Sequence, residues 1–188
     1  MVEPIRIRSA APEDATALAA ALVRNRAYMR NREPYRPERY YTAEGQAERL
    51  ADGGVRFFAV APEPGGGTVV VGAATLSGIA LGPFRSASLG YWVDQGHTGR
   101  GLATALVEEA CRAAREELGL HRVEAGTVLD NHASQRVLAK SGFTRIGTAP
   151  RYLHIDGEWR DHDLFQRLLH DDPPPGVPDA ESPYGDLA

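Results

Sequence analysis

The 188-residue sequence holds very little cysteine and lysine, and this scarcity excludes several classes of protein. The single cysteine, Cys111, cannot form an internal disulfide, and no cluster of cysteine and histidine has the spacing of a zinc site. We therefore predict no bound metal, and we interpret Cys111 as a packed helical side chain. Lys140 is the only lysine, so nearly all of the positive charge is arginine.

Long apolar runs and a surplus of basic residues are also missing. No apolar stretch is long enough to span a membrane, and the first residues show no basic-then-apolar targeting signal, so we expect a cytoplasmic protein. The formal net charge of −4 argues against binding to duplex DNA, which favours a basic face. An apolar fraction of 43% and a charged fraction of 24% are typical of a soluble globular domain of this length.

The stretch from residue 88 to 143 organises the rest of the chain. An apolar strand over 89–93 leads into a glycine-containing loop, and the loop leads directly into a helix over 102–118. The apolar side chains of this helix recur three and four residues apart, as expected for a helix with one buried face. A strand that runs through a glycine turn into a helix is a common setting for an anion site.

The residues of this turn predict that the anion is a pyrophosphate. The first amides of a helix have no internal partners, and the helix dipole places partial positive charge there. Gly99 and Gly101 carry no Cβ, so a phosphate can approach the backbone closely. Arg100 between them adds a guanidinium group that can pair with phosphate.

Two common phosphate loops do not match this sequence well. A P-loop requires Gly-Lys-Ser/Thr at the start of the helix, and that tripeptide is absent. A dinucleotide-binding fingerprint requires three glycines, but Thr104 stands where the third would be. Glu124 follows at a suitable distance, so the dinucleotide alternative stays open, although the chain before this point does not begin with such a unit.

The loop resembles the acetyl-CoA loop of the Gcn5-related N-acetyltransferase (GNAT) family. The family motif, Gln/Arg-x-x-Gly-x-Gly/Ala, aligns with residues 98–103, where Gly101 and Ala103 fit and Thr98 replaces the usual Gln or Arg. Asn131-His132-Ala133-Ser134, followed by Leu138-Ala139-Lys140-Ser141-Gly142-Phe143, is similar to the family's second coenzyme motif.

The last motif narrows the resemblance to one branch. Residues 152–162 resemble the end of RimJ/RimL-type acetyltransferases, which acetylate N-terminal amino groups of ribosomal proteins. Asn25-Arg26 and Pro34 are also similar to that branch. The resemblance covers about residues 4 to 169, with three motifs in the family's order.

The resemblance implies an α/β (α+β) GNAT fold. Its twisted, mixed, mostly antiparallel sheet has about seven strands, flanked by about four helices, with a V-shaped splay between two parallel central strands. The sequence pattern predicts strands over 5–8, 55–60, 68–76, 89–93, 121–129, 143–155 and 158–169. Helices are predicted from Ser9 and Pro12 to about Arg24, and over 43–51, 102–118 and 133–140.

The connections and the chain end complete the prediction. Residues 79–85 are expected to form a loop, and Asp156-Gly157 a two-residue hairpin turn. We expect one acetyltransferase domain over 1–170 and a flexible, acidic, proline-rich tail over 171–188, which has too few large apolar residues to offset the entropy of ordering it.

The resemblance also implies where the coenzyme lies. The pantetheine arm occupies the slot between the splayed strands, and the Val93 amide is the candidate oxyanion donor. Ser134 matches the position near the coenzyme sulfur, as a candidate proton donor, with helix capping as the alternative. The predicted coenzyme-binding residues are Trp92, Val93, Thr98, Gly99, Arg100, Gly101, Leu102, Ala103, Thr104, Asn131 and Ser134.

The acceptor amine must lose its proton before it attacks. At pH 7 this costs roughly 4.6 kcal/mol for a lysine side chain but only about 1.1 kcal/mol for an α-amine, so an N-terminal acceptor needs only a modest base. Glu124, on the strand across the slot, is the predicted general base, directly or through water. The alternative is a solvated or salt-bridged strand carboxylate.

Arginines and tyrosines alternate between residues 24 and 41. Such a mixture can hold RNA or an acidic partner, but we favour a loop whose arginines face solvent and whose tyrosines line a groove. In the similar branch this region borders the acceptor channel. The predicted acceptor-binding residues are Tyr28, Tyr35, Tyr152 and His154.

Together these features predict an N-acetyltransferase that uses acetyl-CoA as co-substrate and transfers the acetyl group directly, as a monomer or homodimer. The expected acceptor is the N-terminal amino group of a protein, such as a ribosomal protein. Two alternatives stay open: acetylation of a small amine such as a polyamine or an antibiotic, and a non-catalytic protein that binds acyl-CoA or the ribosome.

Overall fold

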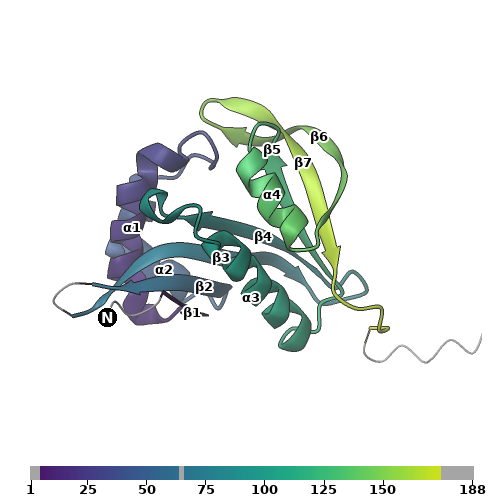
Figure 1. The fold of residues 1–188 in the computed structure, drawn as a ribbon, viewed down its shortest axis with the longest axis horizontal. Helices are drawn as coiled ribbons and strands as arrows, with labels where there is room; N and C mark the ends of the chain where they lie inside the picture. Colours follow the sequence, from purple (N-terminus) through teal and green to yellow (C-terminus); the bar gives the residue numbers. More distant parts are fainter. Residues whose placement is uncertain (1–4, 64–65, 175–188) are drawn as a thin grey trace, which may run out of the picture.

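The computed structural model describes residues 5–63 and 66–174 and shows one sheet with helices on both faces (Figure 1). The strand order is β1-β2-β3-β4-β5-β7-β6. The strands are β1 (Arg6–Ser9), β2 (Val55–Pro62), β3 (Thr68–Ala80), β4 (Ser86–Val93), β5 (Arg122–Val128), β6 (Thr144–Ile155) and β7 (Glu158–Leu168). The α-helices are α1 (Ala15–Met29), α2 (Ala43–Leu50), α3 (Leu102–Glu116) and α4 (His132–Lys140). Short 3-10 turns occupy η1 (Pro12–Asp14), η2 (Glu38–Tyr41) and η3 (Gln95–His97).

Alternation along the central strands divides the core between the two faces of the sheet. In β2, Phe57 packs against the face covered by α3, whereas the next residue, Phe58, packs against the face covered by α1. Leu106 of α3 and Leu138 of α4 belong to the first cluster, and Leu22 of α1 to the second. The central strands are therefore buried on both sides, and α1 and the α3–α4 pair are fixed relative to them.

The two central strands diverge, and this divergence makes room for a site. The strands β4 and β5 are the parallel pair, and they pair only from Ser86↔Arg122 to Ser88↔Glu124. Beyond these residues both strands continue, to Val93 and Val128, without pairing to each other. The predicted mixed, mostly antiparallel sheet with a V-shaped splay is confirmed, as is the number of strands and helices.

The largest differences from the predicted element boundaries are at the ends of α1 and β3. Helix α1 continues to Met29 rather than ending near Arg24, because Asn25 donates from its side chain to the Ala21 carbonyl and Met29 is buried against the sheet. Strand β3 continues to Ala80, through residues predicted as loop, by re-pairing with β4 after an irregularity between Ser77 and Ala80. Neither extension follows a simple local pattern, since both depend on contacts with distant elements.

The closing hairpin agrees with its turn signal. Asp156 (φ 48°) and Gly157 (φ 90°) connect β6 to β7 with positive φ at both positions, as a tight hairpin requires. Of the predicted tail, residues 175–188 lie outside the described residues, so the division between domain and tail stays a prediction. Within the described ranges, no helix has the length and apolar character needed to cross a membrane.

Candidate active site

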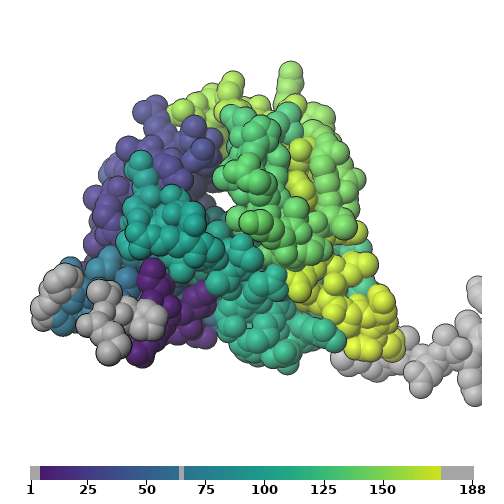
Figure 2. Space-filling view, viewed as in Figure 1, coloured from purple at the N-terminus to yellow at the C-terminus, as the bar shows by residue number. Residues whose placement is uncertain are grey.

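A cavity of about 850 Å³ opens where β4 and β5 diverge. Its walls come from the end of α1 and the segment after it, the splayed ends of β4 and β5, the loop that precedes α3, and one side of α4. Figure 2 shows the hollow between the purple and teal part of the chain and the green α4. The divergent ends of β4 and β5 thus form the floor of the site.

The loop before α3 presents unsatisfied amides to this cavity. Among the described residues, none accepts a hydrogen bond from the backbone amides of residues 98–104, and the first such bond in α3 is Ala105 N–H to Gly101 O at 3.0 Å. Gly99 (φ 73°) and Gly101 (φ 77°) adopt left-handed backbone that favours glycine, and no atom lies within 4 Å of a Cβ built at either. Amide donors beside open space at a helix start fit a phosphate group.

Asp94 anchors this loop to α1. Its buried carboxylate accepts hydrogen bonds from Arg24 Nε at 2.7 Å, Asn25 Nδ2 at 2.8 Å and Gly96 N at 2.9 Å. Burial acts to raise the pKa of Asp94, but these hydrogen bonds outweigh it and hold the pKa well below its usual range. Asn25 Oδ1 also accepts from Gln95 N at 2.9 Å, so one hydrogen-bond network connects α1 to the loop.

The backbone of β4 offers an open donor inside the splay. Asp94 donates its N–H to Val71 O on β3 at 2.9 Å. Because neighbouring residues in a strand point their N–H groups in opposite directions, the Val93 N–H points away from β3 and toward the splay. This placement suits the predicted oxyanion donor.

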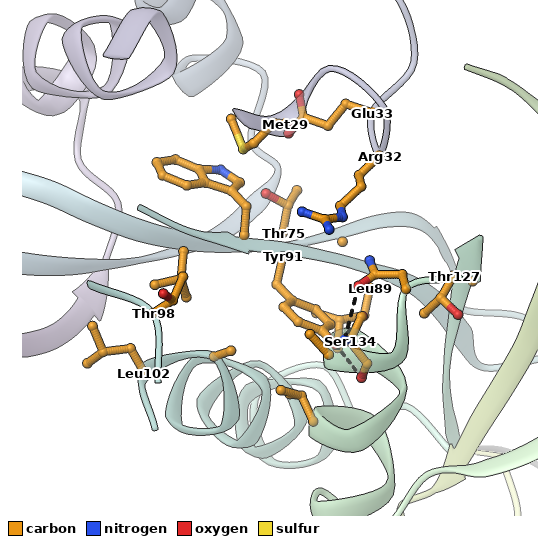
Figure 3. Close-up of a pocket in the computed structure, with 18 of the residues that line it drawn as sticks. Met29, Arg32, Glu33, Thr75, Leu89, Tyr91, Thr98, Leu102, Thr127 and Ser134 are labelled. Carbon is orange, nitrogen blue, oxygen red and sulfur yellow. Dashed lines mark hydrogen bonds between the residues drawn. The ribbon is translucent and has the colours of Figure 1, made fainter. Parts of the chain in front are cut away.

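Tyr91 of β4 and Ser134 of α4 contact each other in the cavity. Tyr91 Oη lies 2.6 Å from Ser134 Oγ and 3.2 Å from the Ser134 carbonyl oxygen (Figure 3). Burial raises the pKa of Tyr91 to about 12 against the opposing effect of the Ser134 hydrogen bond, so the phenol keeps its proton at neutral pH. Asn131 Oδ1 accepts from Ser134 N at 3.2 Å, so Asn131, not Ser134, caps α4.

Most of the predicted coenzyme-binding residues line this one cavity, together with one of the predicted acceptor-binding residues, Tyr28. Those on the coenzyme side are Trp92, Val93, Thr98, Gly99, Gly101, Leu102, Ala103, Thr104, Asn131 and Ser134. Arg100 is absent from the lining, since its exposed side chain lies outside the cavity while its backbone belongs to the amide row. The two predicted coenzyme motifs, which are separate in the sequence, therefore meet at one cavity.

Three predicted acceptor-binding residues do not line the cavity. Tyr35 is 79% exposed. Tyr152 packs its ring 5.2 Å from the ring of His162, and His154 packs edge-on against Trp159 at 5.6 Å. Tyr152 and His154 belong to the β6–β7 hairpin, where these ring contacts hold them. His162 is the only residue of this hairpin that lines the cavity.

Glu124 lies at the end of the paired part of β4 and β5, where it pairs with Ser88. Its carboxylate accepts from Arg122 Nη1 at 3.3 Å, and it is absent from the cavity lining. The lining of β5 begins two residues later, at Gly126. The salt-bridged alternative for Glu124 matches this contact, and the role of general base stays a prediction.

The structure adds functional candidates that the sequence alone did not single out. The Tyr91 hydroxyl faces Ser134 although 43 residues separate them, and Glu33, Arg32, Arg36 and Arg49 line the cavity. Burial raises the pKa of Glu33, and nearby Arg36 opposes this shift. The arginine-tyrosine pattern between residues 24 and 41 was the only sequence signal for Arg32 and Arg36, and it does not say which arginines face inward.

Comparisons with known proteins agree on one family. The family described as "Acetyltransferase (GNAT) domain" matches residues 5–144. The chain is 33% identical to the probable N-acetyltransferase YjcK of Bacillus subtilis, over 79% of this chain and 84% of that protein. It is 32% identical to the [ribosomal protein uS5]-alanine N-acetyltransferase of Escherichia coli, over 84% of each chain.

Solved structures give the same result. The ribosomal-protein-S5-alanine acetyltransferase of Vibrio fischeri superimposes with a TM-score of 0.83 at 28% identity, covering 91% of this chain and 96% of that one. Mycobacterium smegmatis RimJ, solved in complex with CoA-disulfide, superimposes with a TM-score of 0.76 at 28% identity, covering 89% of this chain and 86% of that one.

Proposed function

Because the chain belongs to the GNAT family of acetyltransferases, we propose that it transfers the acetyl group of acetyl-CoA to the N-terminal α-amino group of a protein. The observation that carries this proposal is the row of unpaired amides at 98–104, which opens into the same cavity as the free edge of β4. The similarity to uS5-alanine N-acetyltransferases supports a protein N-terminus, such as that of a ribosomal protein, as the acceptor.

The chain's own groups account for binding and orientation. The amides of residues 98–104 would hold the pyrophosphate, and the splayed edge of β4 would receive the pantetheine arm. The similar structure of M. smegmatis RimJ is a complex with CoA-disulfide, which supports CoA as the ligand. Bound acetyl-CoA supplies an acetyl thioester. The Val93 N–H, directed into the splay, donates to the carbonyl oxygen as negative charge develops on it.

Tyr91 and Ser134 stabilise the departing sulfur. The 2.6 Å contact between Tyr91 Oη and Ser134 Oγ allows either hydroxyl to be the donor. In the proposed reactive arrangement Tyr91 donates to Ser134 Oγ, which leaves the serine hydroxyl hydrogen free to point into the cavity. A thiol has a pKa of about 8.5, well below the value of about 12 for Tyr91, so complete proton transfer from the phenol to a thiolate is uphill. We therefore assign Ser134 hydrogen-bond donation to the sulfur and Tyr91 the positioning of Ser134.

Removal of either hydroxyl tests this pair. We expect Tyr91→Phe and Ser134→Ala each to lower kcat by about 10- to 100-fold, with little change in the KM for acetyl-CoA, and the double variant to lose no more than the worse single one, since the two act as a unit. Tyr35→Phe removes an exposed phenol as the matched control. Additive losses in the double variant would contradict a shared role.

The proposed role of Glu124 has its own test. If its carboxylate takes the ammonium proton through water, Glu124→Gln lowers kcat by about 10²-fold, while the KM for acetyl-CoA stays constant. Arg122→Gln, which removes the ion-pair partner but keeps the carboxylate, is the control. If kcat of Glu124→Gln equals the wild-type kcat at every pH, Glu124 is not the general base and only forms the ion pair with Arg122.

The proposed acceptor is tested by turnover of acetyl-CoA against a panel of amines. The panel contains N-terminal peptides, peptides with an internal lysine and a blocked N-terminus, and small amines including a polyamine. We expect turnover with N-terminal peptides above the other two classes, because an α-amine near pKa 7.8 is far more readily deprotonated than a lysine. No turnover with any N-terminal peptide, alongside good rates on a small amine, would overturn the proposed acceptor.

A further inference from the structure

The arginines between residues 24 and 49 divide into two groups. Four of the seven are ion-paired and do not line the cavity: Arg24 with Asp94, Arg26 with Glu38, Arg30 with Asp156, and Arg39 with Glu48. The other three line the cavity. Among the described residues, no carboxylate lies within 4 Å of any of these three arginines. These three are Arg32, Arg36 and Arg49, which we call the arginine face.

Aromatic rings hold the arginine face in place of carboxylates. The Arg32 guanidinium lies 5.5 Å from the centre of the Tyr28 ring, and Arg36 and Arg49 each lie 5.0 Å from the centre of the Tyr40 ring. Stacking on a ring orients a guanidinium group but leaves its N–H donors free for an anion. Arg36 Nε is buried and has no hydrogen-bond partner, so at least one donor is left unsatisfied.

The arginine face lines the same cavity as the loop assigned to the pyrophosphate. Figure 3 shows Arg32 pointing into the cavity across from Thr98 and Leu102, which mark the loop assigned to the pyrophosphate. Glu33 adds one carboxylate to the cavity lining, and no described cation lies within ion-pair distance of it. Three guanidinium groups and one carboxylate therefore line the cavity in addition to the residues assigned to the coenzyme.

We propose that the arginine face binds a carboxylate of the acceptor while Glu33 receives its ammonium group, so the preferred acceptor is a protein N-terminus with an acidic side chain among its first residues. This inference rests on the proposed function. Each residue of an extended peptide spans at most about 3.6 Å, so only the first few side chains remain near the reacting amine. A polyamine would bring further positive charge to the arginines, and we expect it to be a poor acceptor.

Matched peptides test the proposal on the full chain. Three peptides begin with alanine and differ only at positions two and three, which are Asp-Glu, Asn-Gln or Lys-Lys. We expect kcat/KM to be at least tenfold higher for the acidic peptide than for the neutral one, and to be lowest for the basic peptide, mainly through KM. The acidic preference should shrink as salt concentration rises, since it is electrostatic.

Variants assign the preference to residues. Arg36→Gln and Arg32→Gln should each reduce the ratio between acidic and neutral peptides by about threefold or more. Arg26→Gln, on the same segment but paired with Glu38 outside the cavity, is the matched control and should keep the ratio. Thermal melting of each variant checks folding, and Arg49→Gln replaces any variant that does not fold.

The outcomes separate this inference from the proposed function. Equal rates on all three peptides would overturn the arginine face and leave N-terminal acetylation standing. A raised KM for acetyl-CoA in the arginine variants, with the peptide ratio unchanged, would assign these arginines to the coenzyme and also overturn the inference. No turnover on any peptide would overturn the proposed function itself, and the inference with it.

Discussion

Replacement of Gly101 by valine is expected to weaken binding of CoA by about 10²-fold or more while the protein stays folded. Gly101 (φ 77°) precedes α3 in left-handed backbone, and valine would either strain this turn by about 1–2 kcal/mol or shift it. Its side chain would also occupy the open space that the amides of 98–104 face. Several charge-assisted hydrogen bonds would then be lost together, each worth about 1.5–3 kcal/mol. Calorimetric titration with CoA measures the effect.

Gly53→Val is the matched control for this prediction. Gly53 has nearly the same backbone angle (φ 74°), follows α2, does not line the cavity, and also has no atom within 4 Å of an added Cβ. The two variants should therefore lose similar stability, but only Gly101→Val should lose affinity for CoA. If Gly101→Val binds CoA with wild-type affinity, the amides of residues 98–104 do not form part of the coenzyme site.

Replacement of Asp94 by alanine is expected to lower the free energy of unfolding by about 3 kcal/mol. The change leaves the donors of Arg24, Asn25 and Gly96 without their shared acceptor, and breaking a buried charged network is costly. Chemical denaturation measures the loss. The same variant should bind CoA more weakly, because the hydrogen bonds to Asp94 fix the loop that leads to the amides of residues 98–104. Glu38→Ala breaks the exposed pair with Arg26 and should lower the free energy of unfolding far less than Asp94→Ala does.

Asp94 also predicts how stability depends on pH. Its pKa in the folded protein lies below the unfolded value of about 3.9, so the unfolded chain binds the proton more readily. The stabilisation is therefore fully present above about pH 4 and is lost as pH falls toward the folded pKa. Asp94→Asn should flatten this acid-side loss in a pH series of unfolding measurements. An identical slope in the variant would contradict the assignment.

Local features of the sequence were sufficient for much of the fold. Helix α3 follows from the spacing of its apolar residues, although it ends at Glu116 rather than at residue 118. The Asp156-Gly157 turn follows from the backbone preferences of two residues. The amide row needed only the position of the glycines before the helix. These features involve residues close together in the chain, whose dihedral angles and periodicity are set by the residues themselves.

The composition of the site depended on contacts between distant segments. Tyr91 reaches Ser134 because β4 and α4 flank the splay, and Asp94 reaches Arg24 across 70 residues of sequence. The sequence pattern placed Glu124 across the slot, but the strands separate only after it, so it stays at the paired end. Where two strands part is decided by packing on both faces of the sheet, which no local pattern encodes.

The sequence by itself determined the family, the coenzyme motifs and their order along the chain, because each motif is a short run of residues with a characteristic backbone. The tertiary structure alone decided which charges face the cavity. Between residues 24 and 49 the arginines look alike in sequence. In the part of the chain that the structure describes, the sheet order and the path after α1 place carboxylates beside four of them, whereas the arginine face lines the cavity with no carboxylate within 4 Å. An ion pair depends on the distance between two side chains, and only the folded chain sets that distance.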